Sequence, residues 1–343
     1  MKGREKVYLE FLRIIACFLV IVNHTNNRVF LSIKPSFTWF LSIGYFYVCK
    51  IAVPVFFMIS GAVLLGREEK YKELYKKRVL RVMFVIILFS FIYYLYNCFI
   101  KGTPISIKEF FKLIYQKNIT SAFWYLYSYL GILVMLPLIR KMISTFTNRD
   151  YLYAFGLWGI FYATIPVINH YFNFTKYSGY FSLPIVGGYT IYFIMGYYID
   201  SIIDKEAINR KIASFMWILG IGAIVVSIIL SYKDYNLNPK SYLFMDNRIF
   251  ITTAIPSIAC FYLCKYYFMN YSGGRWIRAI ASWTFGIYLV SDLLIVTFKF
   301  IYTHLINFTH PMVAVVVFEL AVFMAGAVIT MILKRIPGIR QLV

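Results

Sequence analysis

The segment YLEFLRIIACFLVIVNHTN, residues 8–26, is as long as a membrane-spanning helix and is mostly apolar. A helix needs about 20 predominantly apolar residues to cross the hydrocarbon core of a bilayer. Glu10 and Arg13 interrupt the apolar run, and no small-residue cleavage site follows it. We therefore interpret the segment as a retained transmembrane span that carries charge, and not as a cleaved signal peptide.

Similar segments recur along the chain. Of its 343 residues 61% are hydrophobic and 14% are charged, which leaves too little polar surface for a soluble protein of this length. Long apolar runs are typical of helices, because a β-barrel would show a weaker alternating pattern. We predict one all-α membrane domain, residues 1–343, with ten spans near 8–26, 38–65, 79–99, 122–139, 151–168, 181–200, 213–231, 249–268, 279–301 and 311–333.

The Lys and Arg residues are distributed unevenly over the predicted loops. With loops assigned alternately to the two sides, the side that holds both termini carries twice as many basic residues as the other. The positive-inside rule then predicts that both termini are cytoplasmic. Anionic lipid at that surface accounts for the net charge of +21, so no nucleic-acid partner is expected.

The predicted span 38–65 is unusually long and contains Lys50 and Pro54. We expect a tilt, a kink or a re-entrant start there. Lys50 either neutralises a substrate carboxylate or extends its ammonium group to the outer surface, and we favour the second interpretation.

The first span carries a polar stripe. At about 100° per residue, its Glu10, Arg13, Cys17 and His24 fall on one side of the helix, with Arg13 and His24 about 16 Å apart along the axis. Two interpretations are open, because Glu10 and Arg13 are spaced as an ordinary ion pair and His24 stands at the predicted outer end of the span. Either these are structural residues, or His24 is a general base that removes a proton from a hydroxyl group.

Several motifs together resemble the acyltransferase 3 family, whose members are bacterial membrane O-acyltransferases. The acidic residue, Phe-Leu-Arg and later His of the first span resemble the opening signature of that family. Further similar segments follow in family order: VPVFFMISG (53–61), KRVLR (77–81), FWYLY (123–127), TFGIYL (284–289) and KRIP (334–337). Two departures stand out: Ser291 and Asp292 occur where many relatives have a His in the ninth span, and the Pro that often follows the basic pair near the third span is missing.

The resemblance implies transfer of an acyl group, usually acetyl, from cytoplasmic acyl-coenzyme A to a hydroxyl of a cell-surface glycan or an exported small molecule. It also implies a multi-pass protein of the bacterial plasma membrane. No extracytoplasmic hydrolase-like domain is fused at the C-terminus of this sequence, so we expect a stand-alone member. The acyl-coenzyme A would be a donor substrate, and no tightly bound cofactor or metal site is expected. Lys77, Arg78 and Arg81 are the expected phosphate-binding residues at the cytoplasmic mouth, although for any one of them taken singly we slightly favour anchoring to lipid headgroups.

In this scheme the donor arm passes Arg13 and brings its thioester to His24. A nearby donor would stabilise the thioester oxyanion, and the candidates are Ser60, Trp124 and Tyr288. Asp292 and Glu319 lie inside predicted spans, where a carboxylate needs a partner. Either carboxylate is a candidate to orient His24 or to pair with Lys50, and we rank Glu319 first by its depth in the span.

Two other classes of protein are compatible with ten helices and buried charge. A transporter or flippase for glycans or small acids would be supported by inverted repeats with broken helices, and the sequence contains no detectable repeat. A membrane module that binds ligands without catalysis is suggested by the altered ninth span. The acceptor, the acyl group and the oligomeric state are left open by the sequence.

Overall fold

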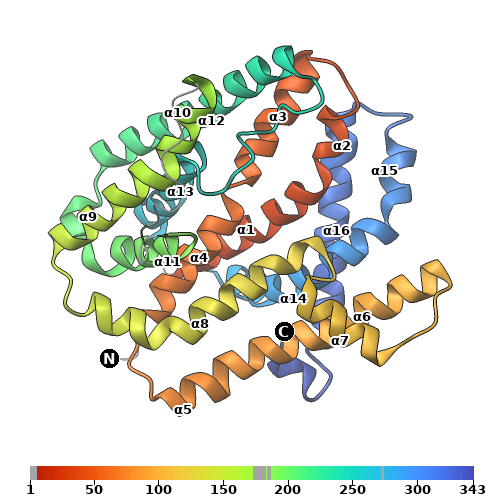
Figure 1. Ribbon diagram of the computed structural model, residues 1–343, viewed down its shortest axis with the longest axis horizontal. Helices are drawn as coiled ribbons and strands as arrows, with labels where there is room; N and C mark the ends of the chain where they lie inside the picture. Colours follow the sequence, from red (N-terminus) through yellow and green to blue (C-terminus); the bar gives the residue numbers. More distant parts are fainter. Residues whose placement is uncertain (1–5, 173–182, 184–186, 272–273) are drawn as a thin grey trace.

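The computed structural model describes residues 6–172, 183, 187–271 and 274–343, and the regular elements in this part of the chain are all helices. Helix α1 (Val7–Thr25) runs through the middle of the bundle (Figure 1). It packs against helices on several sides: α3 (Phe37–Cys49), α4 (Ala52–Leu64), α13 (Ile251–Phe268), α14 (Arg275–Thr297) and α16 (Pro311–Leu333). Helix α1 is therefore covered by protein on several sides, as expected of a span that carries intramembrane charge.

Eight helical segments of the described chain are long and apolar enough to cross a membrane. Several of them combine consecutive helices, because short π-helical or 3₁₀ turns interrupt the α-helical bonding without ending the apolar run. The eight segments are Val7–Phe30, Phe37–Leu64, Tyr71–Lys101, Ser121–Ile143, Asn148–Phe172, Arg210–Leu237, Arg275–Thr297 and Pro311–Leu333. The predicted all-helical, multi-pass architecture is confirmed.

The remaining two predicted spans correspond to helices that do not meet this standard of length and apolarity. Most of the first part of 181–200 lies outside the described residues. The described part of this span forms the short helix α11 (Thr190–Tyr197), which is followed by a π-helical turn, Tyr198–Ile202. Three of the basic residues counted in the predicted loops, Lys2, Arg4 and Lys176, also lie outside the described residues. Helix α13 occupies the predicted 249–268 but contains Pro256 and the buried Lys265. Both helices pack against α4, inside the bundle.

Two glycines let α4 and α11 approach each other closely. A Cβ atom at Gly61 would lie 1.7 Å from the carbonyl oxygen of Phe193, and one at Gly196 would lie 1.9 Å from that of Met58. Small residues at a helix contact allow the backbones to meet, which is how membrane helices gain dispersion contacts without a hydrophobic driving force. Gly61 closes one of the family-like motifs, and this contact explains why that position is a glycine.

The expected distortion of the second span is present as a break between α3 and α4. Lys50 and Ile51 separate the two helices, and Pro54 stands in the first turn of α4. A proline is tolerated there because the first amide groups of a helix have no carbonyl partner within it. Lys50, at this break, lies inside the bundle, where it is 3% exposed.

We call the end of the bundle that holds Lys6, Arg78, Arg140 and Lys334 the basic end. Lys6 is tied there to Asp200 by an ion pair of 2.6 Å, and Arg81 donates to the carbonyl oxygen of Leu342 at 3.3 Å. The opposite end holds four shorter helices and the irregular loop 238–250: α2 (Asn27–Phe30), α7 (Ile107–Gln116), α10 (Ile165–Phe172) and α15 (Lys299–Leu305).

Candidate functional site

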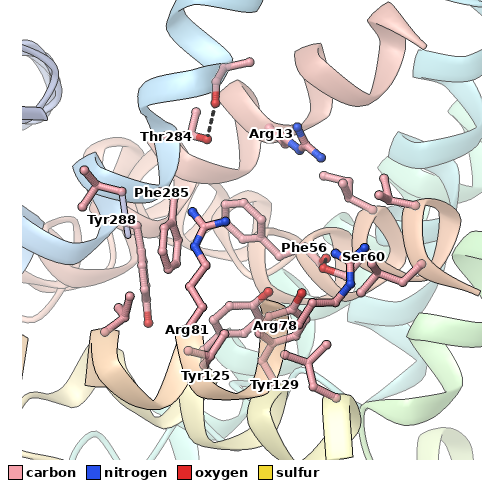
Figure 2. A pocket seen from close by; sticks show the side chains of 18 of the residues that line it. Arg13, Phe56, Ser60, Arg78, Arg81, Tyr125, Tyr129, Thr284, Phe285 and Tyr288 are labelled. Carbon is pink, nitrogen blue, oxygen red and sulfur yellow. Dashed lines mark hydrogen bonds between the residues drawn. The ribbon is translucent and has the colours of Figure 1, made fainter. Parts of the chain in front are cut away.

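A cavity of about 380 Å³ opens at the basic end between α1, α4, α6 (Leu80–Lys101), α8 (Trp124–Ile143) and α14. Figure 2 shows the guanidinium groups of Arg13, Arg78 and Arg81 around it, together with several aromatic rings. Such a volume suits one end of a large substrate. The cavity is lined by Arg13, Phe56, Ser60, Lys77, Arg78, Arg81, Tyr125, Tyr129, Phe285 and Tyr288, among others.

The three predicted phosphate-binding residues all line this cavity. Lys77 and Arg78 belong to the π-helical turn Tyr75–Val79, and Arg81 stands in the first turn of α6. The spacing of four residues puts Lys77 and Arg81 on one helix face. The resulting group of cations is a suitable receptor for phosphate, because guanidinium groups bind phosphate oxygens in pairs.

Arg78 is held in position by Glu69, in the loop before α5 (Tyr71–Leu74). Its Nη2 lies 2.5 Å from Oε1 of Glu69, and Oε2 of the same carboxylate lies 3.1 Å from Nη2 of Arg140 on α8. The hydrogen bonds from Arg78 and Arg140 lower the pKa of Glu69 to about 2, against a smaller opposing effect of burial. Glu69 therefore stays ionised and joins the third span to the fourth.

Arg13 and Glu10 form the ion pair that their spacing predicts, with Nη1 of Arg13 3.0 Å from Oε1 of Glu10. Arg13 nevertheless lines the cavity. Further along the stripe, Cys17 is fully buried, and its thiol donates to the carbonyl oxygen of Thr284 on α14. The stripe is thus divided between a cavity wall at Arg13 and a helix contact at Cys17.

His24 is one of the residues that line a second cavity, of about 20 Å³. This is space for about one water molecule or one hydroxyl group. Its polar walls are Asn23, His24, Lys50, Trp124 and Arg248. The His24 side chain is 19% exposed.

Asp292 faces His24 across this site, with its Oδ1 atom 3.7 Å from Nδ1 of the imidazole. The other carboxylate oxygen accepts hydrogen bonds from the hydroxyl of Thr120, from the hydroxyl of Ser121 at 3.4 Å and from the backbone amide of Ala122 at 3.4 Å. A carboxylate on the Nδ1 side favours the tautomer that carries its proton on Nδ1. Nε2 is then the nitrogen available to a substrate.

The position of Asp292 follows from the face that α14 presents to the turn 120–123. Tyr288 and Asp292 are four residues apart and therefore share a helix face. Tyr288 donates to the carbonyl oxygen of Ala122 at 2.7 Å, while Asp292 accepts from its amide. Ser291, which stands where many relatives have a His, is fully buried and bonds the carbonyl oxygen of Tyr288.

The ranking of Glu319 before Asp292 as the partner of His24 is wrong. Glu319 is fully buried, and its carboxylate accepts from Thr25 at 2.6 Å and from Tyr45 at 2.7 Å. The helical rotation that points Thr25 toward α16 points its neighbour His24 away from it. Glu319 therefore joins α1, α3 and α16 and does not contact His24.

The interpretation of Lys50 as a residue that extends to the surface is also wrong. Lys50 is 3% exposed. Its ammonium group lies 2.7 Å from Oδ1 of Asp246 and 2.7 Å from Oδ1 of Asn23, above the ring of Phe46. A buried ammonium needs such a partner, and the loop 238–250 supplies it. Lys50 therefore pairs with neither Asp292 nor Glu319.

The three candidate oxyanion donors have different surroundings. The hydroxyl of Tyr288 donates to Ala122, and that of Ser60 donates to the carbonyl oxygen of Phe56 at 2.9 Å. Both protons are engaged within the bundle. Trp124 lines the cavity of His24, and the guanidinium of Arg248 lies 5.1 Å from the centre of its ring.

Phe56, Tyr125 and Tyr288 line both cavities. Their rings touch in sequence, with centroids 5.9 Å apart for Phe56 and Tyr125 and 6.0 Å apart for Tyr125 and Tyr288. We call these three side chains the aromatic partition. It is a wall that the cavity of the basic end shares with the cavity of His24.

Sequence reasoning missed four polar residues near His24: Thr120, Ser121, Asp246 and Arg248. Each lies in a loop or at the first residue of a 3₁₀ turn, where a polar residue is unremarkable in sequence. The available signal was the segment Asp246-Asn247-Arg248, which places opposite charges directly before the apolar α13.

The fold and the site together define a multi-pass membrane protein with a cationic cavity at one end and a His-Asp pair at the other. A family model described as an acyltransferase domain matches residues 6–334. The chain belongs to the acyltransferase 3 family and is a membrane acyltransferase, which confirms the resemblance found in its motifs. No curated protein and no solved structure matches the chain.

Proposed function

We propose that this protein transfers an acetyl group from acetyl-coenzyme A, bound at the basic end, to a hydroxyl group of a glycan or other exported acceptor that reaches His24 from the opposite end. The basic end would face the cytoplasm of a bacterial cell, in line with the excess of Lys and Arg there. The acceptor hydroxyl would come from the other side of the membrane.

The observation that carries this proposal is the junction of the two cavities at the aromatic partition. A cationic chamber and a His-Asp pair share the walls formed by Phe56, Tyr125 and Tyr288. A thioester at the inner side of these rings would lie next to a hydroxyl at the outer side. Binding both reactants in one bundle supplies the proximity on which acyl transfer depends.

Lys77, Arg78 and Arg81 would bind the phosphates of the nucleotide end at the mouth of the cavity. The cavity volume of about 380 Å³ suits the pantetheine arm, and the nucleotide would remain outside. The hydroxyls of Tyr129 and Ser60 lie along the same wall, where they offer polar contacts to the amides of the arm. The side chains of Phe56 and Tyr125 must turn aside for the acyl group to reach His24.

The chemistry would be a direct transfer. Nε2 of His24 takes the proton of the acceptor hydroxyl while its oxygen attacks the thioester carbonyl. The tetrahedral intermediate collapses, the carbon-sulfur bond breaks, and the thiolate of coenzyme A takes the proton from the imidazolium. Asp292 holds the imidazole and stabilises its charged form. The products are an ester and free coenzyme A.

The test is acetyl release by purified protein in lipid nanodiscs, with acetyl-coenzyme A as donor and free thiol as the readout. His24→Ala should lower the rate by about 100-fold or more, the usual contribution of a general base. Normal turnover of this variant would contradict the proposal.

His304→Ala is the matched control. His304 is exposed and lies in α15, away from both cavities. This variant should keep the wild-type rate. Mass spectrometry of surface glycans from cells with and without the protein would then identify the acceptor by a mass difference of one acetyl group.

A further inference from the structure

The loop 238–250 brings a guanidinium group to the site of His24. Arg248 is half-buried and lines the small cavity. Its backbone is fixed, because its carbonyl oxygen accepts a 2.6 Å hydrogen bond from the hydroxyl of Tyr192, and the side chain of Asn247 caps the amide of Ile249 at 3.0 Å. Met245, three residues earlier, is fully buried. The loop is therefore built to hold Arg248 in this position.

The charged groups around His24 are not all paired with one another. Lys50 is neutralised by Asp246 at 2.7 Å, and Asp292 faces the imidazole. Arg248 forms no ion pair within the part of the chain that the structure describes. Its guanidinium lies over the ring of Trp124 and hydrogen-bonds to the side chain of Tyr189 instead. Those contacts do not cancel its charge. A guanidinium without a carboxylate partner thus lines the same cavity as the imidazole of His24.

A half-buried guanidinium without a carboxylate partner is a site for an anion. Its planar fork matches the paired oxygens of a carboxylate or a phosphate, and such an anion would be the partner that Arg248 lacks among the described residues. The cavity itself admits about one hydroxyl group, since its volume is about 20 Å³. An acceptor would therefore insert its hydroxyl toward His24 and leave the rest of the molecule outside, over Arg248.

We propose that Arg248 binds an acidic group of the acceptor, so that this enzyme acylates hydroxyl compounds that carry a carboxylate or a phosphate near the reacting hydroxyl. The inference rests on the proposed function, because it assumes that His24 receives the acceptor. It adds the chemical class of that acceptor. Neutral sugars of the same shape would bind more weakly.

The experiment compares matched pairs of probes on the purified protein in nanodiscs at constant ionic strength. The pairs are galacturonate with galactose, and glycerol 3-phosphate with glycerol. Affinity is measured by the ligand-dependent rise in melting temperature, and coenzyme A release from acetyl-coenzyme A is followed separately. We expect at least one acidic probe to bind about 10-fold or more tightly than its neutral partner, the effect of a charge-assisted hydrogen bond.

Arg248→Gln should remove this preference, and Arg248→Lys, which keeps the charge but not the fork, should retain part of it. Lys240→Gln is the matched control, because Lys240 is an exposed cation of the same loop and lines neither cavity. It should keep both the preference and the rate. The melting temperature of each variant without ligand shows whether that variant is folded. If Arg248→Gln is not folded, Arg248→Lys provides the test.

Equal affinities for acidic and neutral probes in the wild-type protein would overturn the inference, as would an unchanged preference in a folded Arg248 variant. Loss of coenzyme A release in Arg248→Gln with the anion preference intact would also overturn it. That result would indicate that Arg248 acts on the donor thioester and does not bind the acceptor. If the wild-type protein prefers acidic probes but releases no coenzyme A, the proposed function fails and the anion site stands.

Discussion

Replacement of Asp292 by Asn tests whether the His-Asp pair is catalytic. The substitution keeps the size of the side chain and removes its charge, 3.7 Å from Nδ1 of His24. At that distance a carboxylate stabilises an imidazolium by about 1 kcal/mol in a water-like medium and by about 4 kcal/mol at an effective dielectric constant of about 20. The side chains of His24 and Asp292 are 19% and 13% exposed, so an intermediate value of about 2 kcal/mol is appropriate. This corresponds to about a 30-fold lower kcat.

The assay is steady-state release of coenzyme A by wild-type and variant protein at saturating acceptor. The KM for acetyl-coenzyme A should stay the same, because Asp292 does not line the cavity of the basic end. Glu319→Gln is the matched control, since it removes a buried carboxylate that contacts Thr25 and Tyr45 but not His24. A kcat of Asp292→Asn within threefold of wild type, or an equal loss in a folded Glu319→Gln, would refute the role of Asp292.

Two further predictions concern the basic end. Arg81→Gln should raise the KM for acetyl-coenzyme A about 10-fold, the effect of one lost charge-assisted hydrogen bond. The control variant Lys76→Gln should leave this KM unchanged, because Lys76 is exposed and lies outside the cavity. Equal KM values for wild type and Arg81→Gln in steady-state kinetics would show that Arg81 is not part of the donor site. Hydrogen bonds from Arg78 lower the pKa of Glu69 from 4.5 to about 2, so the stability that the ionised carboxylate contributes is complete above about pH 4.5 and is lost as the pH falls toward 2. The difference in melting temperature between wild type and Glu69→Gln should therefore shrink between pH 5 and 2.5, and a constant difference would contradict this assignment.

The sequence was sufficient to predict the helical membrane fold. Spans are defined by the length of apolar runs, a local property that the chain carries without reference to its partners. The break near Lys50 was also predictable, because a charged residue and Pro54 interrupt one long run. The two predicted spans that correspond to α11 and α13 do not meet the standard of length and apolarity of the other eight, since helices that pack inside the bundle need less apolar surface than helices that face lipid.

The candidate site was predicted in part. Arg13, Lys77, Arg78 and Arg81 were chosen from motifs and do line one cavity. The side chain of Lys50 was expected at the surface and is buried instead, because its partner Asp246 comes from a loop nearly 200 residues away in sequence. No local pattern indicates that such a loop folds back into the bundle.

The sequence by itself determined that this is a helical membrane protein, which family it belongs to and which helix carries His24. Only the tertiary structure decided that Asp292 and not Glu319 faces this histidine. Hydropathy reports how deep a residue lies in a span, which ranked Glu319 first, and it does not report which face of the helix the residue occupies. Which face of a helix meets α1 depends on rotation and register, and these are set by packing between helices that are distant in sequence.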